Sequence, residues 1–324
     1  MAWELYLQPS YSFIGESFVR RNEALFWVFG VPYDSTASYR PGARQGPQSV
    51  RYASQNIETY SPRSGVDVED VLITDIGDVS VVHGDPGTTL KRVGLVVEGI
   101  VKESKIPIMI GGEHSITFAA TLKAVKKEKD EGFAEGDFMV VVFDAHADLR
   151  EAYLGERFSH ASVSRRIVEE VGPENLLQIG VRAISKEEKQ FVSKNKVVQI
   201  TALEVLKDGL KHVLRRITDL TSTVEKVYVS VDMDVFDPAF APGVGNPEPE
   251  GLSPTNVFDI IWGLEPKICG IDVMELCPPF DFNGITAVLA AKTLFELIAK
   301  AYTQNPIKAK REKNKLYKNK KRRV

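Results

Sequence analysis

Short apolar runs and amphipathic stretches alternate along most of this chain of 324 residues. Short apolar runs bounded by turn residues predict buried strands, and apolar residues three or four positions apart predict helices. The predicted strands cover residues 24–29, 71–76, 106–110, 138–143, 176–181, 197–200, 227–233 and 268–273. The predicted helices cover residues 47–56, 88–102, 115–129, 185–192, 203–220 and 285–302, and two more begin near Ser159 and Ser253. This alternation indicates an α/β fold in which a mostly parallel sheet has helices on both faces.

The chain shows no Pro/Ser-rich linker and no internal repeat, so we expect one domain over residues 1–307. Residues 308–324 form a basic tail with ten Lys or Arg residues and one Glu. The whole chain has a net charge of −3, which leaves −12 on the part before the tail. An acidic body favours a small cationic substrate and makes nucleic-acid binding unlikely. The tail is interpreted as a solvated terminus, with subunit contact or nonspecific anion binding as alternatives.

Cysteine content and hydropathy indicate the cellular compartment of the protein. The two cysteines, Cys269 and Cys277, lie beside apolar segments and are interpreted as buried, reduced thiols. The N-terminus has no basic region followed by an apolar core, so no signal peptide is predicted. No apolar run is expected to reach the length that spans a bilayer. These features predict a cytoplasmic protein with no membrane association.

Polar residues follow the strand predicted over residues 138–143. The apolar run ends in Asp144-Ala-His146-Ala-Asp148. If the chain stays extended there, these three side chains point to the same side, because alternate residues of a strand share a face. Two carboxylates and an imidazole packed together need neutralisation, which a divalent cation supplies. A salt-bridged strand end is the alternative interpretation.

Two further stretches favour a metal site. Asp232 and Asp234 follow an apolar run, and Gly111-Gly-Glu-His114 follows another. Open α/β sheets place their sites at the carboxyl ends of the strands, so these groups are expected to converge. Four Asp and two His residues suit two cations rather than one, and two divalent ions would balance the four carboxylate charges.

These motifs resemble the signatures of the arginase/agmatinase (ureohydrolase) family. The resemblance rests on three segments: Gly111-Gly-Glu-His114-Ser, Asp144-Ala-His146-Ala-Asp148 and Ser230-Val-Asp232-Met-Asp234-Val-Phe-Asp-Pro238. Gly30-Val-Pro-Tyr-Asp34 and Arg40-Pro-Gly-Ala-Arg44 also fit the pattern of the family, and the match spans residues 25 to 303. It implies a three-layer α/β/α fold, two Mn²⁺ ions per chain, and hydrolysis of a guanidino compound to urea and an amine.

The resemblance also implies a role for each site residue. His114 and Asp148 would complete one manganese site, His146 and Asp234 would complete the other, and Asp144 and Asp232 would bridge the two. His160 matches a proton-shuttling histidine, and Glu275 matches the carboxylate that pairs with the guanidinium. From the residues alone, each of these two could equally be structural. Two metal ions about 3.5–4 Å apart can hold a bridging hydroxide that attacks the guanidinium carbon. Asp234 or His160 would then pass a proton to the leaving amine.

The segment after Asp148 looks like that of agmatinases, because it lacks the asparagine-rich stretch with which arginases hold an α-carboxylate. The predicted reaction is therefore hydrolysis of agmatine to putrescine and urea. Val244 and Asn246 depart from the usual Thr-Gly-Thr pattern of the family. For this reason N1-aminopropylagmatine, guanidinobutyrate and arginine remain alternative substrates. The family suggests a trimer or hexamer. Outside the family, a one-zinc deacetylase and a non-catalytic oligomeric binding protein are the rival interpretations.

Overall fold

The computed structural model describes residues 2–15, 21–130 and 137–305. The basic tail over residues 308–324 lies outside these residues, and so does the predicted domain boundary at residue 307. Both stay predictions.

The described chain is built on one nine-stranded sheet, whose strands are ordered β1-β5-β2-β6-β11-β10-β7-β8-β9. All neighbouring strands are parallel except β1 and β5, which are antiparallel. The strands are β1 (Leu7–Gln8), β2 (Phe26–Val31), β5 (Ile73–Val79), β6 (Ile106–Gly111), β7 (Phe138–Phe143), β8 (Leu176–Val181), β9 (Val198–Thr201), β10 (Lys226–Asp232) and β11 (Lys267–Met274). The central strands are apolar on both faces because helices cover both.

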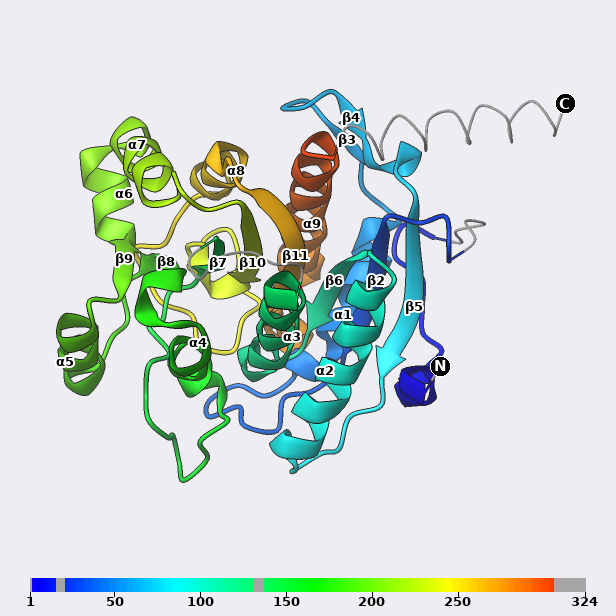
Figure 1. The fold of residues 1–324 in the computed structure, drawn as a ribbon, viewed down its shortest axis with the longest axis horizontal. Helices are drawn as coiled ribbons and strands as arrows, with labels where there is room; N and C mark the ends of the chain where they lie inside the picture. Colours follow the sequence, from blue (N-terminus) through cyan, green and yellow to red (C-terminus); the bar gives the residue numbers. More distant parts are fainter. Residues whose placement is uncertain (1, 16–20, 131–136, 306–324) are drawn as a thin grey trace, which may run out of the picture.

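Two layers of helices enclose the sheet (Figure 1). The helices are α1 (Gly46–Ser54), α2 (Pro86–Lys102), α3 (Thr117–Asp130), α4 (Val163–Val171), α5 (Lys186–Asn195), α6 (Ala202–Asp208), α7 (Leu210–Leu220), α8 (Pro254–Gly263) and α9 (Ile285–Thr303). Helices α2, α3 and α4 pack side by side, as do α1, α9, α8, α7 and α6. Each layer has its own apolar core against the sheet, for example around Val93 and Ile167 in one and Ile261 and Leu294 in the other. The predicted three-layer α/β/α fold is confirmed.

The differences from the predicted elements have local causes. The predicted helix over residues 203–220 is two helices, because Gly209 lies between α6 and α7 with φ 82°. Strand β1 was not predicted, and its two residues pair with β5. The small hairpin of β3 (Tyr60–Ser61) and β4 (Val66–Asp67) was also not predicted. Strands of two residues are too short to show alternation.

One segment reaches membrane-spanning length, but Lys292, Glu296 and Lys300 interrupt its apolar residues. Phe282–Thr303, which includes α9, is long and apolar enough to cross a bilayer by length and composition. However, 61% of its most apolar stretch is buried inside the protein. Helix α9 packs against α1, α8 and β11, which is the arrangement of a core helix.

Charged residues of the N-terminal half make structural contacts. Arg51 is fully buried, and its guanidinium donates to both Asp75 oxygens at 2.7 and 2.9 Å and to Asp78 at 2.5 Å. The acids of the Asp75-Ile-Gly-Asp78 segment therefore neutralise a buried arginine rather than line a site. Arg44 Nε lies 2.8 Å from Asp34 Oδ1, so this arginine anchors its loop to a buried carboxylate.

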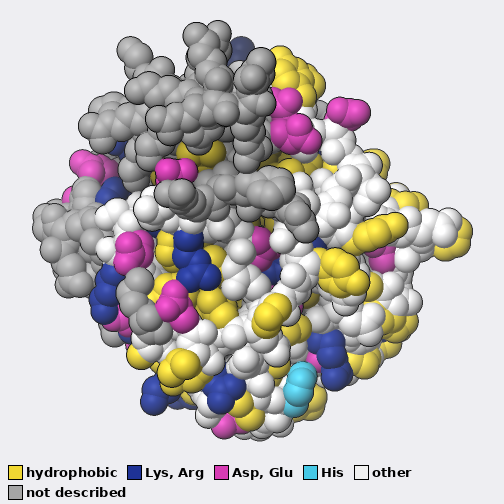
Figure 2. All heavy atoms as spheres, turned by 90° about the vertical axis from the view of Figure 1, so that its right-hand side faces the viewer, with side chains coloured by type: hydrophobic (Ala, Val, Ile, Leu, Met, Phe, Trp, Pro, Cys, Tyr) yellow, Lys and Arg dark blue, Asp and Glu magenta, His cyan; other side chains and the backbone are white. Residues whose placement is uncertain are grey.

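Surface charge shows no basic face in the view of Figure 2, which looks onto the side that carries β1 and β5. Lys and Arg side chains are interspersed there with Asp and Glu among the residues that the structure describes. Interspersed charge gives no continuous positive field for a phosphate backbone.

Candidate metal centre

The carboxyl ends of four adjacent strands bring the candidate site residues together. Strands β6, β11, β10 and β7 are neighbours in that order. His114 follows β6, Glu275 follows β11, Asp232 ends β10 and Asp144 follows β7. Because parallel strands all end at the same edge of the sheet, residues far apart in the sequence meet there.

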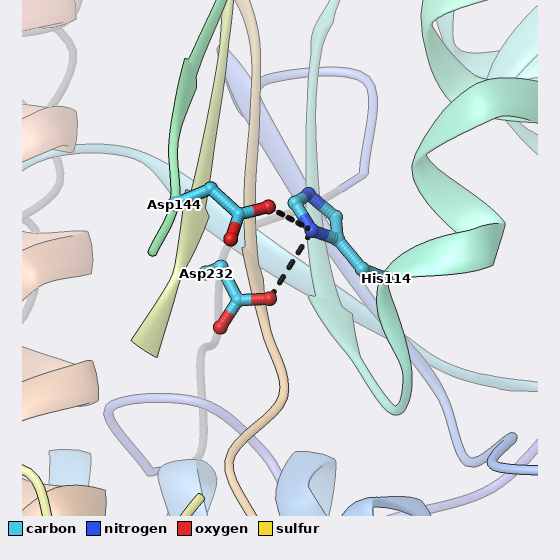
Figure 3. Close-up of side chains that lie close together, drawn as sticks. All are labelled: His114, Asp144 and Asp232. Atoms are coloured by element: carbon cyan, nitrogen blue, oxygen red, sulfur yellow. Dashed lines mark ion pairs between the residues drawn. The ribbon is translucent and has the colours of Figure 1, made fainter. Parts of the chain in front are cut away.

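His114 lies at the centre of a first cluster (Figure 3). Its Nδ1 atom is 3.1 Å from Asp144 Oδ2 and 3.1 Å from Asp232 Oδ2, and both carboxylates point toward it from neighbouring strands. Asp148 Oδ2 lies slightly farther away, 3.7 Å from the same nitrogen. These four side chains are buried.

A second cluster contains His146, Asp144 and Asp234. His146 Nδ1 is 2.8 Å from Asp234 Oδ2 and 3.7 Å from Asp144 Oδ1. Asp144 therefore belongs to both clusters, with one oxygen toward each histidine. Asp232 has one oxygen toward His114, while its Oδ1 accepts a hydrogen bond from Asp234 N at 2.9 Å.

The convergence does not arise from an extended strand, as the sequence analysis supposed. Strand β7 ends at Phe143, and the chain then turns so that Asp144 Oδ1 accepts a hydrogen bond from His146 N at 2.6 Å. Asp148 has φ 50°, a left-handed conformation that is uncommon outside glycine. Turns of this kind, in which an Asp side chain bonds the backbone two residues on, are local chemistry that alternation does not report.

The hydrogen bonds around His114 decide which ring nitrogen faces the carboxylates as an acceptor. Ser230 Oγ donates to Asp272 Oδ1 at 2.5 Å, so the 3.0 Å contact between His114 Nε2 and Ser230 Oγ requires a hydrogen on Nε2. In the neutral ring this leaves a lone pair on Nδ1. His114 Nδ1 and Asp144 Oδ2 are buried and have no hydrogen-bond partner among the described residues. A lone pair and two carboxylate oxygens that face one another fit a cation as their common partner.

The electrostatics of the acids agree with this interpretation. Burial raises the pKa of Asp148 well above its usual value, and the charge of Asp144 adds to the rise. Burial likewise raises the pKa of Asp232, with further contributions from Asp234 and Asp144. Such carboxylates bind protons unless a cation replaces them, so the site is of the kind in which cation binding releases protons.

A cavity of about 330 Å³ opens onto this centre. Its walls include His146, Asp148, Asp232 and Asp234, together with Glu275, His160, Tyr153, Glu248, Asn246, Arg40 and Arg150. Val244 does not reach the cavity: it is buried and pairs with Leu276. Of the two departures from the family pattern, only Asn246 can therefore contact a molecule in the cavity.

Glu275 lies beside the first cluster with φ 62°. Its Oε1 accepts a hydrogen bond from His114 N at 2.7 Å. Burial and the charge of Glu113 raise the pKa of Glu275 to about 8. A half-buried carboxylate with a raised pKa gains from a cationic partner such as a guanidinium, which favours its ionised form.

His160 also lines the cavity and lies in the short 3-10 helix that leads into α4. Its ring meets the ring of Tyr153 edge-on, with centroids 5.9 Å apart. Burial, and then the charge of His146, lowers the pKa of His160 to about 4, so the ring is neutral at neutral pH. The structure thus brings all eight predicted site residues to one edge of the sheet.

Several polar residues around the site were missed by the sequence analysis. Ser230 contacts His114 and Asp272 in turn contacts Ser230. Thr36 contacts His160, and Glu113 in turn contacts Thr36. Polar residues inside the apolar runs of β10 and β11 are a signal that could have revealed the first pair. His212 belongs to an exposed group with Glu204 and Asp208 on α6 and α7, which agrees with a surface role.

The fold and this centre define the class as a three-layer α/β/α protein with two carboxylate–imidazole clusters of the kind that bind divalent cations. The sequence model of the Arginase family matches residues 24–299. The chain is 39% identical to the N(1)-aminopropylagmatine ureohydrolase of Thermococcus kodakarensis over 282 residues, 86% of this chain and 91% of that one. It is 35% identical to the agmatinase of Halalkalibacterium halodurans over 274 residues, 84% of this chain and 90% of that one.

A solved structure agrees with these relatives. The agmatine ureohydrolase of Thermoplasma volcanium superimposes with a TM-score of 0.81 at 37% identity, over 91% of this chain and 97% of that one. The protein therefore belongs to the arginase family, and it is an amidinohydrolase. Membership of this family favours a hydrolase of guanidino compounds over the deacetylase and the non-catalytic binding protein.

Proposed function

We propose that this enzyme hydrolyses agmatine to putrescine and urea with the aid of two Mn²⁺ ions. The observation that carries the proposal is the cavity itself. It joins the two carboxylate–imidazole clusters to Glu275, a half-buried carboxylate suited to a guanidinium, within one small volume. The names of the relatives, agmatinase and N(1)-aminopropylagmatine ureohydrolase, support a guanidino-amine substrate.

The proposed metal ligands are His114, Asp144, His146, Asp148, Asp232 and Asp234. Divalent cations held there would supply a strong nucleophile from water at neutral pH and stabilise the charge that develops during attack. Manganese suits this mixture of carboxylate and imidazole donors. Elemental analysis of protein purified with manganese should give two ions per chain, and a single ion would contradict the proposal.

The proposed roles of the remaining residues follow from their positions. Glu275 would hold the guanidinium by charge-assisted hydrogen bonds and so orient its carbon toward the metal centre. Gly245 leaves one side of Glu275 Oε2 open, because a Cβ at this position would lie 3.7 Å from that oxygen, in van der Waals contact with it. Asp234 and His160 lie on the cavity wall where they could accept a proton and return it to the leaving amine.

A further acid of the cavity wall bears on the choice of amine. Glu248 lines the cavity with a partly exposed carboxylate, 3.8 Å from His146 Nε2. A carboxylate favours a terminal ammonium and disfavours the α-carboxylate of arginine. Agmatine is therefore the proposed substrate, and Asn246 is the wall residue that a longer amine such as N1-aminopropylagmatine would approach.

A substrate panel tests this proposal. Urea release should be measured with manganese for agmatine, N1-aminopropylagmatine, 4-guanidinobutyrate and arginine. Agmatine should exceed arginine by about 100-fold or more in kcat/KM, because an unpaired or repelled charge costs a few kcal/mol. Equal turnover of arginine would refute the agmatinase assignment. No urea from any of the four, with both metals bound, would refute the reaction.

Guanidinobutyrate is a second candidate on a specific observation. Arg40 and Arg150 also line the cavity, and neither is within 4 Å of a carboxylate of the described residues. Arg40 is stacked between Tyr39 and Phe280, at 4.9 and 5.0 Å from the ring centroids. Either guanidinium could bind a terminal carboxylate. Faster turnover of guanidinobutyrate than of agmatine would favour this candidate.

The assembly and compartment are further proposals. We expect a homo-oligomer, a trimer or hexamer, located in the cytoplasm. Exposed apolar side chains support self-association: Tyr52 on α1, Phe282, and Ile285 and Val288 on α9 lie exposed at one end of these helices. Light scattering of the full chain should give a mass three or six times that of the monomer, and a monomer would contradict the expectation.

A further inference from the structure

A chain of hydrogen bonds behind His160 lies outside the residues that the motifs identified. It runs from the buried carboxylate of Glu113 through the hydroxyl of Thr36 to the ring of His160. Glu113 is fully buried and Thr36 partly buried, which protects the chain from exchange with solvent. Thr36 and His160 are separated by 124 residues in sequence, so only the fold brings them together.

Glu113 accepts hydrogen bonds at both of its oxygens. Thr36 N donates to Oε2 at 2.7 Å, and Thr36 Oγ1 donates to Oε1 at 2.7 Å. Ser115 Oγ donates to the same Oε1 at 2.6 Å. Both carboxylate oxygens of Glu113 therefore act as acceptors, and Oε1 accepts from two hydroxyl groups. The single hydrogen of the Thr36 hydroxyl is therefore committed to Glu113.

Two contacts remain at Thr36 Oγ1, and both come from His160. The backbone N of His160 donates to it at 3.0 Å, and the ring Nδ1 lies 3.2 Å away. A hydroxyl group has one hydrogen to donate and two lone pairs to accept with. Since the hydrogen goes to Glu113, Nδ1 can bond Thr36 only by carrying a hydrogen itself. Nε2 then holds the lone pair, and it lies beside Ser38 Oγ, 3.4 Å away, on the wall of the cavity.

We propose that Thr36, held by Glu113, is a positioning residue that fixes His160 as the Nδ1–H tautomer with its Nε2 lone pair toward the cavity. The catalytic part of this inference rests on the proposed function, in which His160 moves a proton to the leaving amine. A ring with the opposite tautomer would present an N–H to the cavity, and it could not accept a proton there. Thr36 thus acts through His160 and does not touch the substrate.

Matched substitutions at Thr36 test the proposal in the full-length, manganese-loaded enzyme. Thr36→Val keeps the shape of the side chain and removes the hydroxyl, whereas Thr36→Ser keeps the hydroxyl. In Thr36→Val we expect kcat to fall at least about tenfold with KM within about threefold, because general acid–base catalysis contributes about 10²–10⁴. Thr36→Ser should stay within about threefold of the wild type, since the hydrogen bonds are retained. Equal losses in the two variants, or no loss in Thr36→Val, would overturn the proposal.

A double substitution distinguishes positioning from a general structural effect. If Thr36 acts only through His160, then Thr36→Val should change kcat by less than about twofold in a His160→Asn background, because coupled residues are not additive. A full additional loss there would mean that Thr36 acts elsewhere. Manganese content and melting temperature of each variant show whether the metal centre and the fold are retained.

The tautomer can also be read without any turnover. Protein labelled with ¹⁵N-histidine and loaded with zinc, which is diamagnetic, should show His160 with hydrogen on Nδ1 and none on Nε2. The signals that disappear in His160→Asn identify the residue. A neutral His160 ring with its hydrogen on Nε2 would overturn the proposal even in an active enzyme. Absence of urea from every guanidino compound would instead refute the proposed function, and the spectrum would still decide the tautomer.

Discussion

Replacement of Ser230 by alanine should weaken metal binding at His114 without touching a proposed ligand. Ser230 is fully buried, and its hydroxyl joins His114 Nε2 to Asp272. A cation bound to Nδ1 requires that the ring hydrogen sit on Nε2. In Ser230→Ala the metal-bound state would therefore hold a buried Nε2–H without an acceptor, whereas the metal-free ring could move its hydrogen to Nδ1. Such a group costs about 1–3 kcal/mol. This corresponds to a loss of about 10- to 100-fold in metal affinity.

Thr117→Val provides a matched control for this change. The Thr117 hydroxyl donates to the other oxygen of Asp272, Oδ2, at 2.9 Å. Both variants therefore remove one buried hydroxyl that bonds Asp272, but only Ser230→Ala removes a partner of His114. We expect a similar fall in melting temperature in the two variants, since each loses one hydrogen bond at the same carboxylate.

Metal affinity is the measurement that separates the two variants. Apoprotein is titrated with Mn²⁺, and free Mn²⁺ is followed by electron paramagnetic resonance. Ser230→Ala should show one site weakened by about 10- to 100-fold, while Thr117→Val stays within about threefold of the wild type. Equal affinities in the two variants would refute the argument that Ser230 and Asp272 set the His114 tautomer for a metal.

Three further predictions concern other parts of the site. Asp144→Ala should lose both metal ions, because Asp144 belongs to both clusters, and two ions per chain by elemental analysis would contradict this role. Leu154 has φ 50° and forms a two-residue hairpin turn with Gly155, a conformation that asparagine tolerates. The unfolding free energy of Leu154→Asn should therefore exceed that of Leu154→Ala by about 0.5–1 kcal/mol. Denaturation with urea measures the difference, and equal stabilities would argue against strain. For His160, the pKa of about 4 lies below the unfolded value near 6.5, so the unfolded chain binds the proton more readily and stability rises with pH between these values. The unfolding free energy of the wild type minus that of His160→Asn should therefore increase by at most about 3 kcal/mol from pH 4 to pH 7. A difference that does not change with pH would refute the lowered pKa of His160.

The sheet was predictable because its central strands are buried on both faces. An apolar run without alternation predicts such a strand directly, and β7 begins and ends at the predicted residues 138 and 143. Other boundaries shift by a few residues, as for β5, where the polar Asp75 and Asp78 fall inside the strand. These acids are tolerated there because Arg51 neutralises them, and no local pattern could reveal a partner 24 residues away.

The two carboxylate–imidazole clusters were predictable because buried charge is costly, so acids at the ends of apolar strands require a neutralising partner. The path that brings the acids together was not predictable. Asp148 and Glu275 both have a positive φ, which depends on the loops that hold them. Conformations of this kind persist only where the surrounding structure enforces them, and they are concentrated at functional sites. Alternation therefore identified residues that do lie together, but it assumed a backbone geometry that the chain does not adopt.

Two histidines of the site have their tautomers fixed by the same arrangement, a hydroxyl group bonded to a buried carboxylate, but the hydrogen sits on a different ring nitrogen in each. Behind His114, a serine hydroxyl gives its hydrogen to the buried Asp272, so Nε2 carries a hydrogen and Nδ1 faces the carboxylates. Behind His160, a threonine hydroxyl gives its hydrogen to the buried Glu113, so Nδ1 carries the hydrogen and Nε2 faces the cavity. In each case a carboxylate that never meets the substrate decides which nitrogen is free to bind. A metal ligand and a proton carrier need different nitrogens, and the position of one buried acid relative to each ring is enough to select between them.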